Sequence, residues 1–510
     1  MLVPIDEFIE RKIVIGLITS TPYITEIARI NKLEYLNASS ARLISNWCLK
    51  YFQKYNSAPG KEIEAIFAEK MRQGLREEQV EDISELLSGL STEYTNSEFN
   101  VTYLLDQTIR YLRQEELLAI SNQIKNGIEK DELDEVEKLV LEYLPIQEEE
   151  TTEVDPFEKR ETVQSAFLTA QENVIKFPKA LGHFWNDQLV RGGFVALLAA
   201  EKRGKSYLLL EMAMRAVQSG SKVAFFQAGD MTQEQQLRRM YIYLAKRSDK
   251  ERYCKESYVP VVDCWLNQTG ECSKNDREGV DSLFTSVSKQ SDITKEILLD
   301  AIEATPEYLV CRNCEQIQGA VYLDKQPAVE ILTWKGAYTK VRDWNKKYAK
   351  KMKLSTHPND SLSVRDIDNI LEQWRKTENF IPDVVIIDYA DILVADPDAS
   401  KLDWRNQQNA IWKKLRKLSQ VRNCLVLTAT QAAASSYKKE TIDLTDFSED
   451  KRKFAHVTAM YGMNQTPEEK KLGILRLNEL VVRESDFDIT RQVKVLQCLQ
   501  RGRPFIGSYF

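Results

Sequence analysis

The feature that most constrains the fold is a short loop between an apolar run and a helical segment. The run VALLA begins at Val195, and the loop after it ends in Gly204, Lys205 and Ser206. Such a loop lets backbone amides approach phosphate oxygens, while the lysine reaches the β and γ phosphates and the serine hydroxyl can bind magnesium. We therefore expect ATP and Mg²⁺ as cofactors. The predicted nucleotide-binding residues are Ala199, Arg203, Gly204, Lys205 and Ser206.

Three further β-rich runs begin at Val223, Val384 and Leu425 and are separated by helical segments. Strands that alternate with helices predict a parallel sheet covered by helices on both faces. Asp388 ends the run from Val384, where a Walker B carboxylate would hold magnesium through water. The predicted magnesium site is therefore Ser206 and Asp388. The alternative for Asp388 is a strand-end aspartate that caps a turn.

The remaining sequence predicts several domains, because 510 residues exceed one ordinary core. Helical periodicity from Ile5 to about Ile128 predicts an all-α N-terminal domain over residues 1–146. Residues 147–178 comprise an acidic linker and one amphipathic linker helix, Phe157 to Lys176. Residues 179–510 form the nucleotide-binding domain, which contains an inserted subdomain at about 253–355 because that gap is too long for a crossover.

The overall charge and hydropathy exclude some classes of protein. A net charge of -7 argues against nonspecific coating of nucleic acid, although it permits a local basic channel. The apolar runs are far shorter than the roughly 20 residues that cross a bilayer, and no secretory leader is recognisable. We expect a cytoplasmic protein with no membrane partner.

Four segments together resemble the ordered motifs of DnaB-type replicative DNA helicases. They are RGGFVALLAAEKRGKS, FFQAGDMTQEQQLRRM, VVIIDYADIL and LVLTATQ. In that family the phosphate-binding loop also commonly starts with alanine, which accounts for Ala199. The resemblance implies an α/β RecA-type P-loop motor domain preceded by an all-α domain. It also implies a divergent, phage-like member of the family, and a phage protein would act in the host cytoplasm.

The resemblance also implies roles for individual residues. Asp230 stands where the family has the glutamate that orients the attacking water, and aspartate keeps the carboxylate on a shorter arm. Gln431 resembles the polar sensor that couples the γ-phosphate to DNA-binding loops. Arg483 lies near the position of a basic finger that acts in a neighbouring subunit, whereas Ser485 replaces the second expected basic residue. A solvated glutamine and a simple edge-strand arginine are the alternatives.

The implied partners are single-stranded and forked DNA, a homo-hexameric ring, a primase and a helicase loader. DNA contacts in such a ring need flexible basic loops that contact the phosphate backbone. A solvated surface is the alternative for any charge run. The candidate DNA-binding residues are Lys438, Lys439, Lys451, Arg452 and Lys453.

The insertion contains two cysteine pairs that predict a structural zinc site. Four thiolates can bind zinc tetrahedrally and stabilise a small subdomain, and Cys254 is a substitute ligand. Reduced, unrelated cysteines are the alternative. The segment from Trp334 to Tyr348 is basic and aromatic, so it suits either nucleic acid or an amphipathic helix. The candidate zinc ligands are Cys264, Cys272, Cys311 and Cys314.

The function that these features predict is an ATP-dependent replicative DNA helicase that moves along single-stranded DNA as a ring. Two other functions remain open. One is a RecA-like recombinase or regulatory ATPase without unwinding, although the helical domain and linker helix favour the helicase. The other is a scaffold that binds nucleotide without hydrolysing it and holds a primase or loader, which Asp230 and Ser485 keep open.

Overall fold

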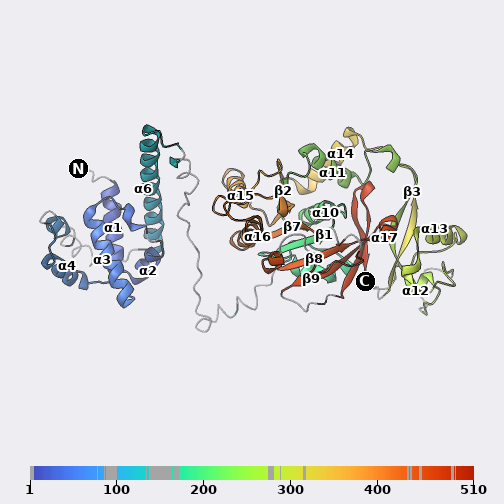
Figure 1. The fold of residues 1–510 in the computed structure, drawn as a ribbon, viewed down its shortest axis with the longest axis horizontal. Helices are drawn as coiled ribbons and strands as arrows, with labels where there is room; N and C mark the ends of the chain where they lie inside the picture. The colour runs from blue at the N-terminus through green and yellow to red at the C-terminus, as the bar shows by residue number, and fades with distance from the viewer. Residues whose placement is uncertain are drawn as a thin grey trace. The chain divides into compact units, whose positions relative to one another are not determined.

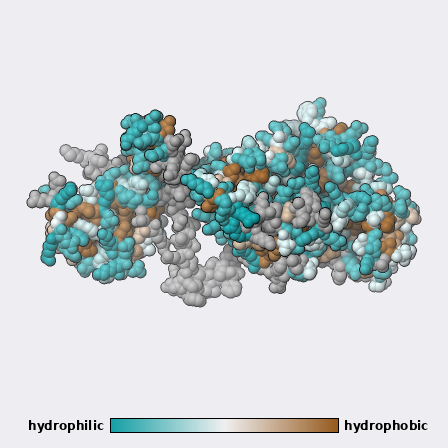
Figure 2. Space-filling model, in the orientation of Figure 1, coloured by the Kyte–Doolittle hydropathy of each residue, from teal (hydrophilic) through white to brown (hydrophobic). Residues whose placement is uncertain are grey.

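A computed structural model describes most of the chain in two compact units, Met1–Pro156 and Phe157–Phe510. The described residues are 5–30, 32–76, 79–84, 87, 100–133, 135–136, 164, 172–273, 281–287, 289–313, 318–433, 436, 439–446, 451–483, 488 and 490–510. In this part of the chain no helix has the length and apolar character that crossing a membrane requires. Figure 2 shows a mostly hydrophilic surface with small hydrophobic patches on the visible face.

The first unit is helical (Figure 1), as its sequence periodicity predicts. Its core is formed by apolar side chains such as Ile13, Tyr23, Ile44 and Leu112. The helices are α1 (Ile5–Thr19), α2 (Thr21–Ile30), α3 (Ser39–Tyr55), α4 (Glu62–Arg72) and α6 (Val101–Glu129).

The second unit is built on a nine-stranded sheet in the order β11-β10-β9-β8-β1-β7-β6-β2-β5. Neighbouring strands from β5 to β8 are parallel, whereas β8 to β11 pair antiparallel. The strands are β1 (Phe194–Ala199), β2 (Val223–Ala228), β5 (Met352–His357), β6 (Val384–Asp388), β7 (Leu425–Gln431), β8 (Ala459–Asn464), β9 (Ile474–Val482), β10 (Gln492–Cys498) and β11 (Arg503–Tyr509).

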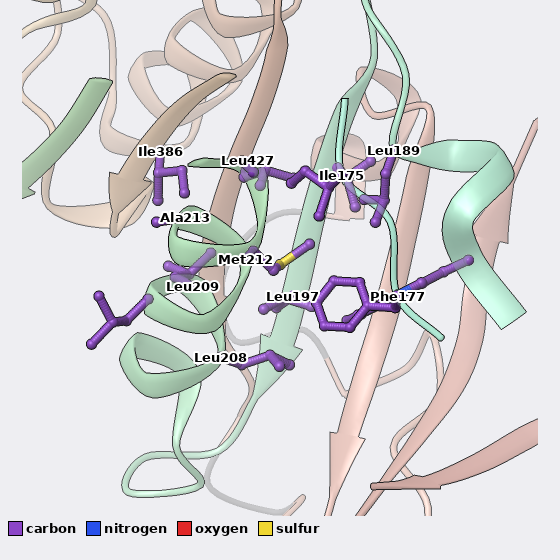
Figure 3. Packing of buried hydrophobic residues seen from close by; sticks show 14 of the residues in the cluster. Ile175, Phe177, Leu189, Leu197, Leu208, Leu209, Met212, Ala213, Ile386 and Leu427 are labelled. Carbon is purple, nitrogen blue, oxygen red and sulfur yellow. The ribbon is translucent and has the colours of Figure 1, made fainter. Parts of the chain in front are cut away.

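Helices cover both faces of this sheet. Side chains alternate between the two faces along each strand, so one strand contributes to two separate cores. Leu197 of β1 packs with Leu209 and Met212 of α10 on one face (Figure 3). Its neighbour Leu198 joins the opposite core, which contains Trp412 of α16. The predicted fold class is therefore confirmed. The helices of this part are α9 (Lys179–Trp185), α10 (Lys205–Gln218), α11 (Gln233–Ala245), α15 (Val364–Glu378), α16 (Trp404–Val421) and α17 (Pro467–Leu472).

The end of the predicted linker helix has a different structure. Residues 172–176 are not helical, and Asn173 forms an antiparallel bridge with Val190. Ile175 is fully buried and Phe177 is 4% exposed, both in the core that contains α10. Val174, the one described residue among the apolar positions that suggested an amphipathic helix, is a core residue of the second unit. The earlier part of the predicted helix lies outside the described residues, apart from residue 164.

The insertion forms a small antiparallel pair of strands, β3 (Ser257–Cys264) and β4 (Gly319–Gln326). Helices α12 (Trp265–Gln268) and α13 (Lys295–Ala304) accompany it. Its core continues into the main sheet through Leu496 and Tyr509. The chain then returns through α14 (Trp334–Tyr348) to β5, which pairs with β2. The last residues of the predicted insertion, from Met352 onward, thus belong to the main sheet.

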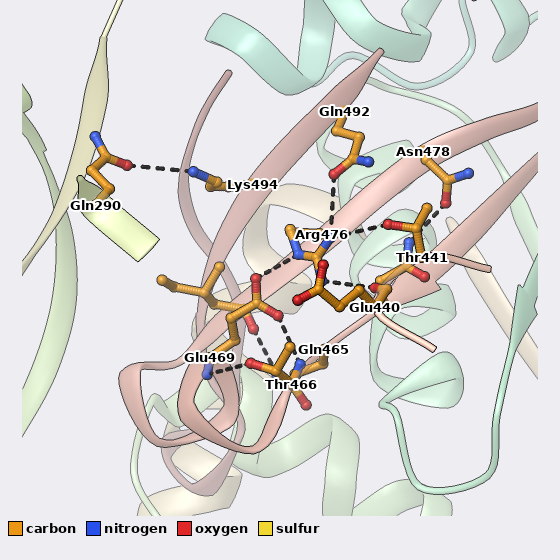
Figure 4. Close-up of polar contacts among 12 residues, drawn as sticks. Gln290, Glu440, Thr441, Gln465, Thr466, Glu469, Arg476, Asn478, Gln492 and Lys494 are labelled. Atoms are coloured by element: carbon orange, nitrogen blue, oxygen red, sulfur yellow. Dashed lines mark hydrogen bonds and ion pairs between the residues drawn. The ribbon is translucent and has the colours of Figure 1, made fainter. Parts of the chain in front are cut away.

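A polar cluster stabilises the antiparallel part of the main sheet. Arg476 of β9 forms an ion pair with Glu469 of α17 and donates to the backbone oxygen of Glu440 at 2.8 Å (Figure 4). Glu469 also caps its own helix, because its carboxylate accepts from the Thr466 amide at 2.7 Å. Arg476 therefore holds β9, α17 and the segment at Glu440 together.

Candidate nucleotide-binding site

The phosphate-binding loop lies at the centre of the sheet. It connects the end of β1, between β7 and β8, to the first turn of α10. Gly204 precedes the helix with φ of 89°, a left-handed conformation that glycine adopts without steric cost. Lys205 Nζ donates to the Ala199 carbonyl oxygen at 2.9 Å, across the loop. Burial lowers the pKa of Lys205, and the carboxylates of Asp391, Asp388, Glu201 and Asp230 oppose this shift.

Ser206 and Asp388, which are 182 residues apart in sequence, meet beside this loop. The Ser206 hydroxyl donates to Asp388 Oδ1 at 3.1 Å. Ser206 follows β1 and Asp388 ends β6, and β7 lies between these two strands in the sheet. Asp388 is 1% exposed, and its Oδ2 has no hydrogen-bond partner among the described residues. Burial raises the pKa of Asp388 to about 6, against the Ser206 hydrogen bond and the charge of Arg239.

This pair fits the predicted magnesium site. A buried carboxylate oxygen without a partner is costly, and buried charges are normally paired or bind metal ions. Carboxylate and hydroxyl oxygens at the end of a phosphate-binding loop are ligands that suit magnesium. The open oxygen of Asp388 is therefore the atom at which a hydrated ion fits best.

Asp230 lies at the edge of the same site. It follows β2, the strand next to β6, and its side chain is exposed. Its charge raises the pKa of Asp388, and it also contributes to raising the pKa of Tyr389 to about 12, after burial as the main cause. The structure thus places the Asp230 carboxylate near the phosphate-binding loop, and a carboxylate there is chemically suited to orient a water molecule.

Gly229 positions Asp230, so replacing it tests the role of that carboxylate. Gly229 has φ of 109°, and an added Cβ would lie 2.4 Å from Asn359 Cα. We expect Gly229→Ala to displace the Asp230 loop and lower ATP turnover about tenfold, while the affinity for nucleotide changes little. Steady-state kinetics and nucleotide titration measure the two quantities. Gly220→Ala is the matched control, because Gly220 also has positive φ but no atom within 4 Å of an added Cβ.

Gln431 links β7 to the phosphate-binding loop. Its side-chain amide donates to Glu201 Oε1 at 2.8 Å, and its backbone amide donates to Asp391 Oδ2 at 2.9 Å. Asp391 also accepts from the Thr430 hydroxyl at 2.8 Å. A change in the loop would therefore reach the end of β7 through direct hydrogen bonds, as a sensor requires.

Arg483 lies far from the loop of its own chain. It directly follows β9, where Val482 pairs with Ala459, and Ala459 pairs with Val195 at the start of β1. Lys205 lies beyond the opposite end of β1, so Arg483 and Lys205 lie at opposite ends of the strands. Arg483 is exposed and donates to the Ala455 carbonyl oxygen. Ser485 lies outside the described residues.

Arg203, the remaining predicted residue of the loop, contacts the segment that follows β8. Its guanidinium donates to the backbone oxygen of Gln465, which follows β8. This contact ties the loop to the neighbouring strand. Arg203 therefore has a structural partner in this conformation.

The candidate DNA-binding lysines differ from the sequence interpretation in one important case. Lys453 is 1% exposed, and its Nζ forms an ion pair with Asp391 Oδ1 at 2.7 Å. It therefore is not a solvent-facing loop residue, and the interpretation of Lys453 as a DNA contact does not fit the structure. A run of charges in sequence does not reveal which member turns inward.

Two other candidates, Lys439 and Arg452, are exposed. Lys439 pairs with Asp446 at 2.9 Å and Asp443 at 3.1 Å, and their hydrogen bonds raise the pKa of Lys439. Arg452 is exposed and donates to Asn406 Oδ1 at 2.9 Å. Lys438 and the side chain of Lys451 lie outside the described residues.

The buried pair yields a stability prediction. Because Lys453→Met leaves the Asp391 carboxylate buried without its cation, we expect a loss of about 3 kcal/mol in the free energy of unfolding. Urea denaturation of the full chain measures this loss, with Arg452→Met as the exposed control. Unchanged stability together with lost DNA binding would instead restore Lys453 as a DNA contact.

The sequence interpretation missed Arg239. This residue lies on α11, 4.3 Å from the centre of the Tyr207 ring, and its charge lowers the pKa of Asp388. Its Nη1 is buried with no hydrogen-bond partner among the described residues. The available signal was a basic residue on the helix directly after the Asp230 loop. Arg239 therefore places a cation near Asp388 within the same chain.

The zinc prediction has no structural support. Among the described residues, no group of three or more His, Cys, Asp or Glu side chains is suited to a metal ion. The Cys254 thiol donates to the Ser248 and Lys250 carbonyl oxygens, both at 3.4 Å. Cys264 and Cys272 are half-buried, Cys311 is buried, and Cys314 lies outside the described residues.

The sequence matches no family model and no curated protein. Solved structures that resemble the chain include that of a DnaB-like replicative helicase, described together with its interactions with primase. It shares 14% identity, over 97% of this chain and 98% of the other, with a TM-score of 0.49. The ATPase domain of a second protein shares 13% identity, over 67% of this chain and 95% of the other, with a TM-score of 0.42. At such low similarity neither match bears on function.

Proposed function

We propose that this chain is an ATP-driven motor that moves along single-stranded DNA and separates forked duplex DNA. The observation that carries the proposal is the meeting of Ser206 and Asp388 beside the loop that ends in Lys205. A P-loop lysine, a serine and a strand-end carboxylate are the shared parts of nucleotide-hydrolysing P-loop sites.

The chemistry assigned to the chain follows from these positions. Lys205 binds the β and γ phosphates, and Ser206 with Asp388 holds Mg²⁺, which neutralises phosphate charge when bound. Asp230 orients the attacking water, and Arg239 offers a positive charge from the same chain. Gln431 reports the state of the loop to the segment after β7, where Lys438 and Lys439 are the candidate DNA contacts.

We infer that the motor works as a ring of identical subunits, with six copies as the expected number. The supporting observation is the position of Arg483, at the opposite end of the strands from Lys205. An arginine placed there is too far from its own site and suits the nucleotide of a neighbouring copy. A primase and a helicase loader are the partners that we propose for the helical unit.

Strand displacement on a forked duplex tests the proposal. The full chain is expected to release the labelled strand with ATP, and not with a non-hydrolysable analogue or when Lys205→Ala replaces the wild type. Sedimentation with Mg²⁺ and nucleotide measures the subunit number in parallel. Hydrolysis without strand release would contradict unwinding and favour a RecA-like ATPase.

A further inference from the structure

Helix α14 (Trp334–Tyr348) presents a surface that the proposed motor does not use. The helix returns from the insertion toward β5 and contacts α11 (Figure 1). Trp334 is 75% exposed and Tyr338 is 64% exposed. Exposed aromatic side chains mark binding sites when they gather on one surface.

The inner face of α14 is sufficient to hold the helix. Apart from Gly336, its partly buried residues are Ala337, Val341, Trp344 and Tyr348, at the spacing of one helical face. Trp344 and Tyr348 pack against the core that contains α10. The start of the helix is fixed as well, because the Leu332 amide donates to the Ser248 oxygen at 2.8 Å. Folding therefore does not require aromatic rings on the outer face.

The outer face carries a continuous ridge of four residues. Trp334, Tyr338, Arg342 and Lys346 follow one another at intervals of four, so each lies about 6 Å further along the helix than the last. Rings and cations that follow one line can stack on bases and pair with phosphates at the same time. We call these four residues the α14 ridge.

The charge of α14 favours a polyanion. The helix contains five basic residues and one acidic residue, although the whole chain has a net charge of -7. Among the described residues, Arg342 has no ion-pair partner, whereas Lys453 and Lys439 are already paired with aspartates. Within the described part of the chain, Lys346 pairs only with the exposed Asp343, at 3.4 Å. The ridge therefore keeps positive charge available to an external phosphate backbone.

We propose that the α14 ridge is a second binding surface for single-stranded DNA, separate from the loops after β7. Bases stack on Trp334 and Tyr338, while Arg342 and Lys346 contact phosphates. Binding of this kind tolerates any sequence, because every base has a flat face, and it weakens with salt. The inference does not depend on ATP hydrolysis, so it stands or falls separately from the proposed motor activity.

The test compares ring removal with ring retention in the full chain without nucleotide. Fluorescence anisotropy with labelled oligothymidylate measures the affinity. We expect Trp334→Ala with Tyr338→Ala to weaken binding about tenfold or more, because stacking of each base is lost. The matched pair Trp334→Phe with Tyr338→Phe keeps both rings and should bind within about threefold of wild type. Arg342→Ala should lower the salt dependence of the affinity by about one phosphate contact.

A photocrosslink locates the contact independently of other DNA sites. Oligonucleotide that contains 5-iodouracil is expected to form adducts with Trp334 or Tyr338. Adducts found only outside 334–348, with unchanged affinity of the alanine pair, would overturn the proposal. A change in sedimentation of the alanine pair without a change in DNA binding would also overturn it, because α14 would then contact another protein chain.

Discussion

Lys205→Ala is expected to lower the rate of ATP hydrolysis by about 1000-fold. The lysine is the residue of the loop whose ammonium reaches the β and γ phosphates, where negative charge develops during transfer. In the structure its Nζ donates to the Ala199 oxygen, so the side chain already lies across the phosphate-binding loop. The loss should appear in kcat, measured by release of inorganic phosphate.

Lys202→Asn is the matched control for Lys205. Lys202 lies in the same loop, is exposed and has φ of 58°, a conformation that asparagine tolerates. We expect its turnover to stay within about threefold of wild type, because one exposed charge contributes little. Equal losses in both variants would show that general loop charge, and not the Lys205 contact, supports hydrolysis.

Asp388→Asn has the second large effect, with an expected loss of about 100- to 1000-fold in turnover. The amide keeps the size of the carboxylate but removes the charge that binds magnesium beside Ser206. Asp383→Asn is the control, because Asp383 directly precedes the same strand and interacts with Arg191 at 2.7 Å, at the opposite end from the loop. Titration with magnesium separates lost metal binding from lost folding.

Asp388→Asn should also stabilise the folded chain at neutral pH in the absence of nucleotide and magnesium. Burial raises the pKa of Asp388 from 3.8 to about 6, so the folded state binds this proton more tightly than the unfolded state. Stability therefore falls as pH rises from about 4 through 6, by about 3 kcal/mol for this group. Asp388→Asn should unfold at higher temperature than wild type at pH 7.5, and the difference should disappear near pH 4. A variant less stable at pH 7.5 would contradict this account.

The fold was predictable where one physical pattern dominates. Fully apolar runs such as that from Val384 to Ile387 occur in strands buried on both faces, and they predicted the parallel sheet. The run at Met352 was missed because β5 lies at the edge of the sheet, with half-buried residues throughout. An edge strand needs fewer apolar residues, so its sequence signal is weaker.

The candidate site was predictable in its residues but only partly in its contacts. Spacing within the loop identified Lys205 and Ser206, and the strand end identified Asp388. The sequence did not reveal that Asp391 gathers Thr430, Gln431 and Lys453 into one buried cluster. Such long-range pairing depends on the packed sheet, which no local pattern encodes.

The central claim is tested most directly by ATP hydrolysis with and without single-stranded DNA, using wild type and Lys205→Ala. The account predicts turnover that DNA stimulates in the wild type and that falls to background in the variant. Wild-type protein that binds ATP yet matches the background of the variant with DNA present would contradict a motor. That result would identify Asp230 as part of a disabled site and favour a nucleotide-binding scaffold.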